Sequence, residues 1–255
     1  MRLPRRLRHG EEATLVEHLG ELRARLLTSL GAVVVAFIFT YWQRDWLLEK
    51  LREPLPDGFE LTTFSPGEPF VTSFTVAFYA ALAIALPILI WQLWAFLAPA
   101  LTESNQAAVA RLVGAATVLL LCGMAFGYFI ALPNILDFLL NFDSDQYNTQ
   151  LRAHDYFRFT SLLLLGFGLM FELPVFILGC VRLGVLSAAK LRRNRRVGYG
   201  LCIIAVVLLP GVDFVSMGLQ ALPVLVLFEA SIWLAVVMER RWARALGQEL
   251  GGQSL

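Results

Sequence analysis

The chain has 255 residues, of which 58% are hydrophobic and 16% are charged, and its formal net charge is +1. Soluble domains average about 25% charged residues, so this composition excludes an ordinary soluble domain. The small net charge points to no particular partner, and we expect no bound nucleic acid.

The hydrophobic residues are concentrated in six long runs, uncharged except for one glutamate in the fourth and one in the sixth. The runs are Leu26–Tyr41, Pro69–Leu101, Leu112–Leu136, Phe159–Val181, Val197–Val212 and Phe214–Met238. About 20 apolar residues cross a bilayer as a helix. We therefore predict an all-α integral membrane protein with six transmembrane helices, bowed into a concave bundle. The fifth run is closed by Pro210-Gly211, which predicts short fifth and sixth spans.

The predicted organisation is an N-terminal segment over residues 1–25, one transmembrane domain over 26–238 and a tail over 239–255. The N-terminal segment contains a stripe of leucines at helical spacing, namely Leu15, Leu19, Leu22 and Leu26. The stripe predicts a short amphipathic helix that lies along the membrane surface before it turns into the bilayer. On the opposite side Glu21 and Arg25 are spaced to form an ion pair, although Glu21 could instead bind a cationic ligand. The spacing alone favours the ion pair.

The distribution of Lys and Arg predicts the orientation. Most of these residues outside the runs fall in alternate segments, including the N-terminus, the stretch Arg182–Arg196 and the tail. Positively charged segments stay in the cytoplasm, so we predict a multi-pass protein of the cytoplasmic membrane with both termini inside. Four prolines in the first outer loop predict a turn-rich cap; they are Pro54, Pro56, Pro66 and Pro69.

Two carboxylates lie at matching depth in the fourth and sixth runs. Glu172 and Glu229 each precede the next charged residue by ten positions. At about 1.5 Å per residue, this places them roughly 15 Å inside the membrane boundary. A carboxylate at the centre of a bilayer costs on the order of 2.5–3.5 kcal/mol, so a role in function is the default interpretation.

Three roles are open for these acids. They could relay protons in a proton-coupled small-solute transporter, but the fourth and sixth runs offer little of the continuous polar path that a relay needs. They could bond to Ser, Thr or backbone groups of neighbouring helices and fix the packing of these helices, which we favour for Glu229. A backbone carbonyl freed by Pro174 could bind Glu172 in this way. The third role is contact with a partner protein.

Signals of enzymatic chemistry are missing from the sequence. The three histidines, His9, His18 and His154, lie outside the hydrophobic runs, and there is no phosphate-binding glycine loop. We therefore predict no enzyme activity, no cofactor and no metal site.

Five motifs in chain order resemble those of TatC, the polytopic subunit of the twin-arginine protein translocase. They are His18–Leu26 (HLGELRARL), Ser65–Phe70 (SPGEPF), Trp91–Leu101 (WQLWAFLAPAL), Gly166–Pro174 (GFGLMFELP) and Leu227–Glu229 (LFE). Each motif is weak alone, but their order on six predicted spans is specific. The resemblance covers roughly residues 15 to 240.

The resemblance implies a receptor for folded precursor proteins whose signal peptides carry paired arginines. Such a receptor assembles with single-span TatA- and TatB-type subunits, associates with further copies of itself, and transports precursors at the expense of the proton-motive force. By motif, the signal-peptide site falls on Glu21, Arg23, Phe96, Glu103 and Asn105. Adjacent guanidinium groups favour carboxylates in bidentate geometry, which fits Glu21. The partner-helix contact falls on Glu172, Pro174 and Asp213.

The chain departs from the family pattern at two of these positions. Asn105 stands where the family usually has a glutamate, and an amide is a weaker acceptor for a guanidinium. We hypothesise that Glu103 substitutes for it. Met217 replaces a common glutamine near Asp213, which predicts fewer amide contacts with partners at the outer surface.

Overall fold

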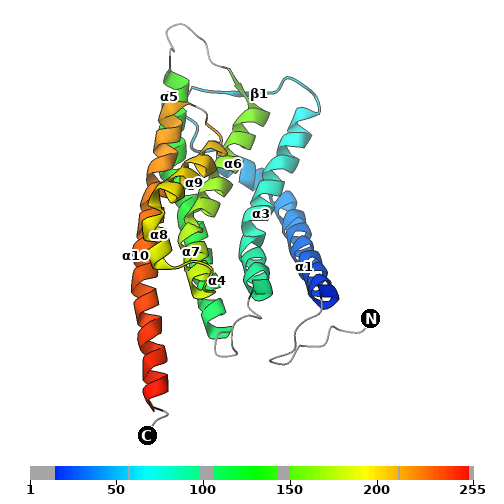
Figure 1. The fold of residues 1–255 in the computed structure, drawn as a ribbon. Coiled ribbons are helices and arrows are strands. Elements are labelled where there is room, and N and C mark those ends of the chain that lie inside the picture. The colour runs from blue at the N-terminus through cyan, green and yellow to red at the C-terminus, as the bar shows by residue number, and fades with distance from the viewer. Residues whose placement is uncertain (1–14, 57, 98–105, 143–149, 212, 253–255) are drawn as a thin grey trace.

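The computed structural model describes residues 15–56, 58–97, 106–142, 150–211 and 213–252 (Figure 1). The described elements are α1 (Leu15–Trp42), α2 (Arg44–Arg52), β1 (Leu61–Thr62), α3 (Glu68–Leu97), α4 (Gln106–Phe126), the π-helical segment η3 (Gly127–Ala131), α5 (Leu132–Asn141), β2 (Leu151–Arg152), α6 (Ala153–Phe171), α7 (Leu173–Arg182), α8 (Ala188–Arg193), α9 (Arg195–Val207) and α10 (Phe214–Gly252).

Within the part of the chain that the structure describes, five helical stretches are long and apolar enough to cross a membrane. They are Leu19–Trp42, Glu68–Phe96, Leu112–Asn141, Ala153–Arg182 and Phe214–Arg241. The prediction of an all-α, multi-pass membrane protein is thus confirmed. The predicted fifth run forms α9, whose 13 residues extend about 20 Å. Since a bilayer core is about 30 Å thick, the count of six spans stays a prediction.

The helices form a bundle in which neighbours pack pairwise. α1 packs on α3, α3 on α6, and α6 on α4, while α7 and α9 pack on α10. Figure 1 shows α1 and α3 on one side of the bundle and α10 on the other. We call the end that holds β1 and β2 the β end, and the end where α1 begins and α3 ends the N-terminal end.

The first helix differs from the sequence prediction in one respect. α1 is a single helix from Leu15 to Trp42, with no turn near residue 25. The reason lies in the sequence itself, because no proline interrupts this stretch and the Glu21–Arg25 ion pair stabilises the helix across the predicted boundary. The described part of the amphipathic segment therefore continues directly into the first span.

The buried core is divided into clusters to which α1 and α3 contribute as well as the later helices. Its largest fully buried side chains include Leu132, Ile135, Leu163 and Phe167 from α5 and α6. α4 approaches α6 closely at Gly123, where a Cβ atom would lie 2.5 Å from the carbonyl oxygen of Phe167. Glycine at this position therefore permits the close packing of the two helices.

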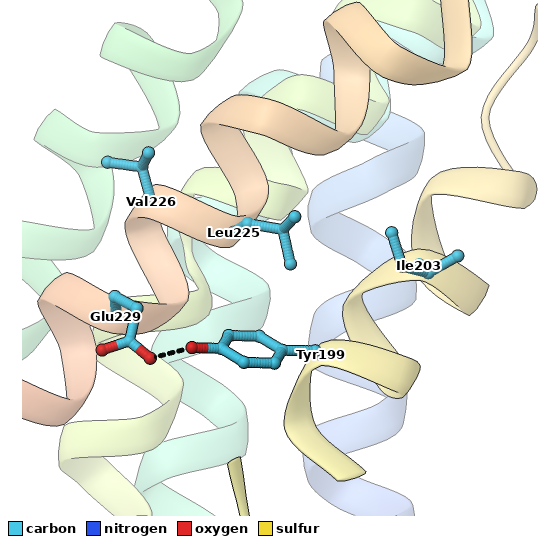
Figure 2. Close-up of a pocket in the computed structure, with 5 residues that line it drawn as sticks. All are labelled: Tyr199, Ile203, Leu225, Val226 and Glu229. Atoms are coloured by element: carbon cyan, nitrogen blue, oxygen red, sulfur yellow. Dashed lines mark hydrogen bonds between the residues drawn. The ribbon is translucent and has the colours of Figure 1, made fainter. Parts of the chain in front are cut away.

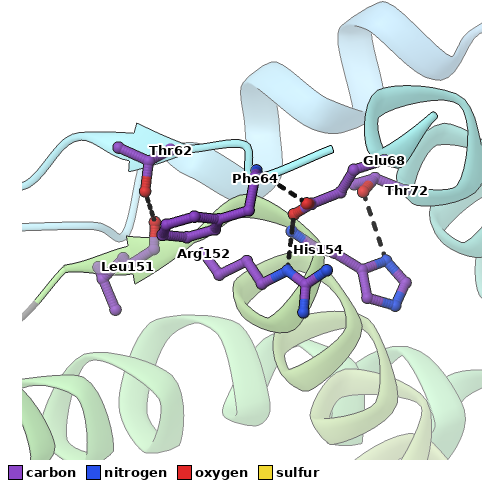
Figure 3. A network of polar contacts seen from close by, with 7 residues as sticks. All are labelled: Thr62, Phe64, Glu68, Thr72, Leu151, Arg152 and His154. Carbon is purple, nitrogen blue, oxygen red and sulfur yellow. Dashed lines mark hydrogen bonds and ion pairs between the residues drawn. The ribbon is translucent and has the colours of Figure 1, made fainter. Parts of the chain in front are cut away.

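The predicted cap at the β end is built around the carboxylate of Glu68 (Figure 3). Its Oε2 accepts a hydrogen bond from the amide of Phe64 (3.0 Å), and its Oε1 accepts from Arg152 Nε (3.1 Å) and from the amide of His154 (3.3 Å). The Glu68 side chain is only 3% exposed. Its hydrogen bond and charge raise the pKa of Arg152. The parallel pairing of β1 with β2 adds to this link between the segment that precedes α3 and the start of α6.

Candidate functional site

The carboxylate of Glu21 is paired within its own helix at the N-terminal end. Its Oε1 accepts hydrogen bonds from Arg25 Nε (3.0 Å) and Arg25 Nη2 (2.5 Å). Arg25 Nη1 also contacts Gln92 Oε1 on α3 (3.4 Å). The side chains of Arg25 and Glu21 are 25% and 30% exposed. The ion pair that the spacing favoured is therefore formed, and it is accessible from solvent.

Of the other four residues predicted to bind a signal peptide, the structure describes two, Arg23 and Phe96. Arg23 is exposed on α1. Phe96 lies one helical turn beyond Gln92, near the end of α3, so the Arg25–Gln92 contact brings this part of α3 to Glu21. Glu103 and Asn105 lie outside the described residues.

Glu172 occupies a break between two helices. α6 ends at Phe171 and α7 begins at Leu173, because Pro174 has no amide hydrogen and its ring prevents regular helix geometry. The amide of Glu172 donates to the carbonyl of Leu169 (3.1 Å), and its own carbonyl accepts from the amide of Phe176 (2.9 Å). The backbone at the break is thus satisfied locally.

The side chain of Glu172 is not satisfied in the same way. The residue is 9% exposed, and its Oε1 is buried without a hydrogen-bonding partner among the described residues. The backbone carbonyls near Pro174 therefore do not bind this oxygen, in contrast to one of the possibilities left open by the sequence. A buried acceptor without a donor is costly, so it marks a position that a ligand or partner could complete.

Glu229 has a different environment from Glu172, although the sequence placed them at equal depth. The hydroxyl of Tyr199 on α9 donates to Glu229 Oε1, and Arg195 Nη2 lies 3.4 Å from Glu229 Oε2. The Glu229 side chain is 29% exposed and lines a cavity of about 550 Å³ with Tyr199, Ile203, Leu225 and Val226 (Figure 2). Its partners come from α9, rather than being the Ser, Thr or backbone groups that the sequence suggested.

Asp213 caps the start of α10. Its Oδ1 accepts a hydrogen bond from the amide of Ser216 (2.7 Å), as expected of an N-cap residue. Burial alone would raise the pKa of Asp213, but its hydrogen bonds with Ser216 and nearby amides outweigh burial and lower it. Asp213 Oδ2 is buried without a partner among the described residues. The hydrogen bonds to Oδ1 thus favour the charged carboxylate, while Oδ2 is enclosed by the chain.

This arrangement of helices is shared with known proteins. The family model for the Sec-independent protein translocase protein TatC matches residues 17–223. The chain belongs to the TatC family. TatCd of Bacillus subtilis (strain 168) is 34% identical to this chain over 238 residues, and the match covers 92% of this chain and 96% of TatCd. TatC of Magnetococcus marinus is 33% identical over 238 residues, covering 91% of this chain and 88% of its own.

A solved TatC structure has the same fold. The crystal structure of the twin-arginine translocase receptor TatC in the detergent DDM superimposes with a TM-score of 0.78 at 30% identity, and the match covers 86% of this chain and 99% of that one. Membership of the TatC family, predicted from five motifs, is therefore confirmed. The chain is a component of a protein translocase, and the small-solute transporter is not favoured.

Three residues of these sites escaped the sequence analysis of this TatC chain. Gln92 stood within a recognised motif without a role, and Tyr199 stood in an apolar run. Arg195 was counted among the basic residues of a loop, whereas the structure pairs it with Glu229. Tyr199 and Arg195 lie four positions apart on α9, which was the available signal that they share a helix face.

Proposed function

We propose that this chain is the receptor and core subunit of a twin-arginine translocase in the cytoplasmic membrane, with its N-terminal end in the cytoplasm. Both chain termini then lie on the cytoplasmic side. The observation that carries the proposal is the likeness to the solved twin-arginine translocase receptor across 86% of the chain. The substrate class is a folded precursor whose signal peptide carries two adjacent arginines.

The signal peptide binds at the N-terminal end. Glu21 supplies a half-exposed carboxylate there, and the contact of Arg25 with Gln92 holds α1 beside the end of α3, which includes Phe96. A guanidinium binds a carboxylate with two parallel hydrogen bonds, which a lysine ammonium does not reproduce. In this proposal Glu103 provides the second carboxylate of the site, in place of Asn105.

A partner helix docks at Glu172. A single-span subunit with a polar side chain at matching depth would supply the hydrogen bond that Oε1 lacks, once the Glu172 side chain turns outward from its buried position. In a membrane interior, such a hydrogen bond favours association because the alternative is an unsatisfied polar group in hydrocarbon. The partners are TatA- and TatB-type subunits and further copies of this chain, and the proton-motive force drives transport.

The test is site-specific photo-crosslinking in membranes that contain a twin-arginine precursor and the single-span subunits. We expect a crosslinker at position 22, beside Glu21, to capture the signal peptide and one at position 169, one turn before Glu172, to capture a single-span subunit; Leu22 and Leu169 are exposed, so both carboxylates are kept. Glu60, exposed at the β end, is the control position and should capture no signal peptide. Capture of the precursor from position 60 but not from position 22 would refute the proposed orientation and docking site.

A matched pair of substitutions tests the partner contact. Glu172→Gln and Glu229→Gln make the same chemical change, but Glu229 already has partners within the chain. We expect export of the precursor to fall in the first variant and to remain near the wild-type level in the second. Equal export by the two variants would rule out a special role for Glu172.

A further inference from the structure

The ion pair at the N-terminal end presents Glu21 with a guanidinium that belongs to the same chain. Arg25 uses two nitrogens, Nε at 3.0 Å and Nη2 at 2.5 Å, and both contact the same carboxylate oxygen, Oε1. Among the described residues none donates to Oε2 of Glu21. The proposed binding site is therefore already half occupied by the kind of group it is proposed to bind.

We propose that Arg25 occupies Glu21 as an internal competitor, so that a cationic ligand binds well only if its own hydrogen bonds to Glu21 outweigh those of the displaced ion pair. The proposal rests on the proposed function of Glu21 as the receptor for a signal-peptide arginine. Binding is then an exchange of one guanidinium for another, instead of the filling of an empty site.

The geometry provides a path for this exchange. An incoming guanidinium can first contact Oε2, which faces no donor from the described chain, while Arg25 still holds Oε1. Arg25 also has a second acceptor, because its Nη1 contacts Gln92 Oε1 at 3.4 Å. When it leaves Glu21 it can therefore stay bound to α3, and the released side chain does not lose all of its hydrogen bonds.

The exchange sets a threshold that arginine passes more easily than lysine. A peptide arginine replaces the two hydrogen bonds of Arg25 with two of its own, through a planar fork that matches a carboxylate. A lysine ammonium is a compact point charge without this fork, so it gains less from Glu21. The cost of displacing Arg25 is the same for both peptides and lowers both affinities by the same factor. A peptide with paired lysines, which starts with the weaker affinity, then loses useful occupancy of the site first.

A purely structural role for Arg25 predicts the opposite sign. If Arg25 only positioned the Glu21 carboxylate for the ligand, its removal would weaken binding of every cationic peptide. If Arg25 competes, its removal strengthens binding of both peptides by the same factor. The sign of the affinity change therefore separates the two roles.

The experiment measures binding of two synthetic signal peptides to the purified full chain in nanodiscs by fluorescence anisotropy. One peptide carries Arg-Arg and the other carries Lys-Lys at the same positions. The variants are Arg25→Gln, Arg25→Lys, Glu21→Gln and, as control, Arg193→Gln. Arg193 is exposed on α8 and also loses one positive charge, so it reports the effect of net charge alone.

We expect Arg25→Gln to bind the Arg-Arg peptide about two- to fivefold more tightly, which is the range of a partly exposed ion pair. The affinity for the Lys-Lys peptide should increase by the same factor, because both peptides displace the same ion pair. The affinity of Arg25→Lys should lie between those of wild type and Arg25→Gln, and this variant keeps the positive charge in case the glutamine variant misfolds. Arg193→Gln should leave both affinities near the wild-type values.

The outcomes separate this inference from the proposed function. If Glu21→Gln weakens binding while Arg25→Gln gives equal or weaker binding, Glu21 is the receptor and competition by Arg25 is refuted. If Arg25→Gln and Arg193→Gln strengthen binding equally, the effect is net charge and the inference fails. If Glu21→Gln binds both peptides as wild type does, the proposed docking at Glu21 is itself refuted.

Discussion

Replacing Gly179 by alanine should destabilise the contact between α7 and the end of α3. A Cβ atom at Gly179 would lie 1.8 Å from Cη2, 2.2 Å from Cζ2 and 2.6 Å from Cζ3 of Trp94. Carbon atoms in contact are normally about 3.5–4.0 Å apart, so the ring would have to move by about 2 Å. Trp94 is only 5% exposed, and its surroundings leave the indole little room for such a shift.

The expected cost follows from overpacking. Inserting a methyl group into a well-packed core typically costs about 1–3 kcal/mol. For a chain of 150–250 residues this corresponds to a decrease in Tm of roughly 2–12 °C, measured by thermal unfolding in detergent. Gly200→Ala in α9 is the matched control, because a Cβ at that position has no atom within 4 Å. It should leave the Tm unchanged or raise it.

A double-mutant cycle tests the cause. In a Trp94→Leu background the indole is absent, so adding Gly179→Ala should cost much less than it does in the wild type. The reasoning would be refuted if the alanine cost the same in both backgrounds. It would also be refuted if Gly179→Ala and Gly200→Ala gave equal Tm values.

Three further predictions concern polar groups outside this contact. Glu68→Gln should loosen the cap at the β end, because glutamine lacks the negative charge that pairs with Arg152. We expect limited proteolysis to cut faster between α2 and α3 in this variant, and an unchanged cleavage rate would contradict the prediction. Tyr199→Phe should lower the Tm by removing the hydroxyl that donates to Glu229, whereas an unaltered Tm would mean that the hydrogen bond contributes no net stability. Asp213→Asn should lower the Tm at neutral pH. Because the pKa of Asp213 is lowered, its stabilisation is fully present above the ordinary value of 3.8 and is lost as the pH falls through the lower value of the folded state. The Tm difference between wild type and variant should therefore be constant from pH 5 to 8 and narrow below about pH 3.8, and a difference that widened in acid would contradict the sign.

Much of the fold could be predicted because hydrophobic runs and membrane thickness define spans directly. Five of the six predicted runs correspond to helices long enough to cross a bilayer. The break at Glu172 could be anticipated only in part, since Pro174 signals a disturbed helix but does not say where the flanking segments end. The pairing of β1 with β2 could not be predicted, because each strand has only two residues and no alternating pattern.

Glu172 and Glu229 show that position along a hydrophobic run does not predict the environment of a side chain. Depth along a helix says nothing about the direction in which a side chain points or which neighbour it meets. Glu229 faces α9 and finds Tyr199 and Arg195, whereas Glu172 faces a region in which no described residue donates to its Oε1. Such differences depend on how the helices pack, and a hydrophobicity pattern from a single sequence does not contain that information.

The network at the β end also has a consequence for how the chain is made. Glu68 and Arg152 are 84 residues apart, so the ribosome completes α3, α4 and α5 before the partner of Glu68 exists. The two residues can meet only if those helices have been threaded so that both begin their spans on the same side of the bilayer. A chain with one helix inserted the wrong way would leave the carboxylate without its guanidinium, at a cost in free energy. The hydrogen bonds of Glu68 with Arg152 and His154 can therefore form only in a chain whose helices α3 to α5 were inserted in the correct direction. The residues that form these bonds are all synthesised before α7 to α10.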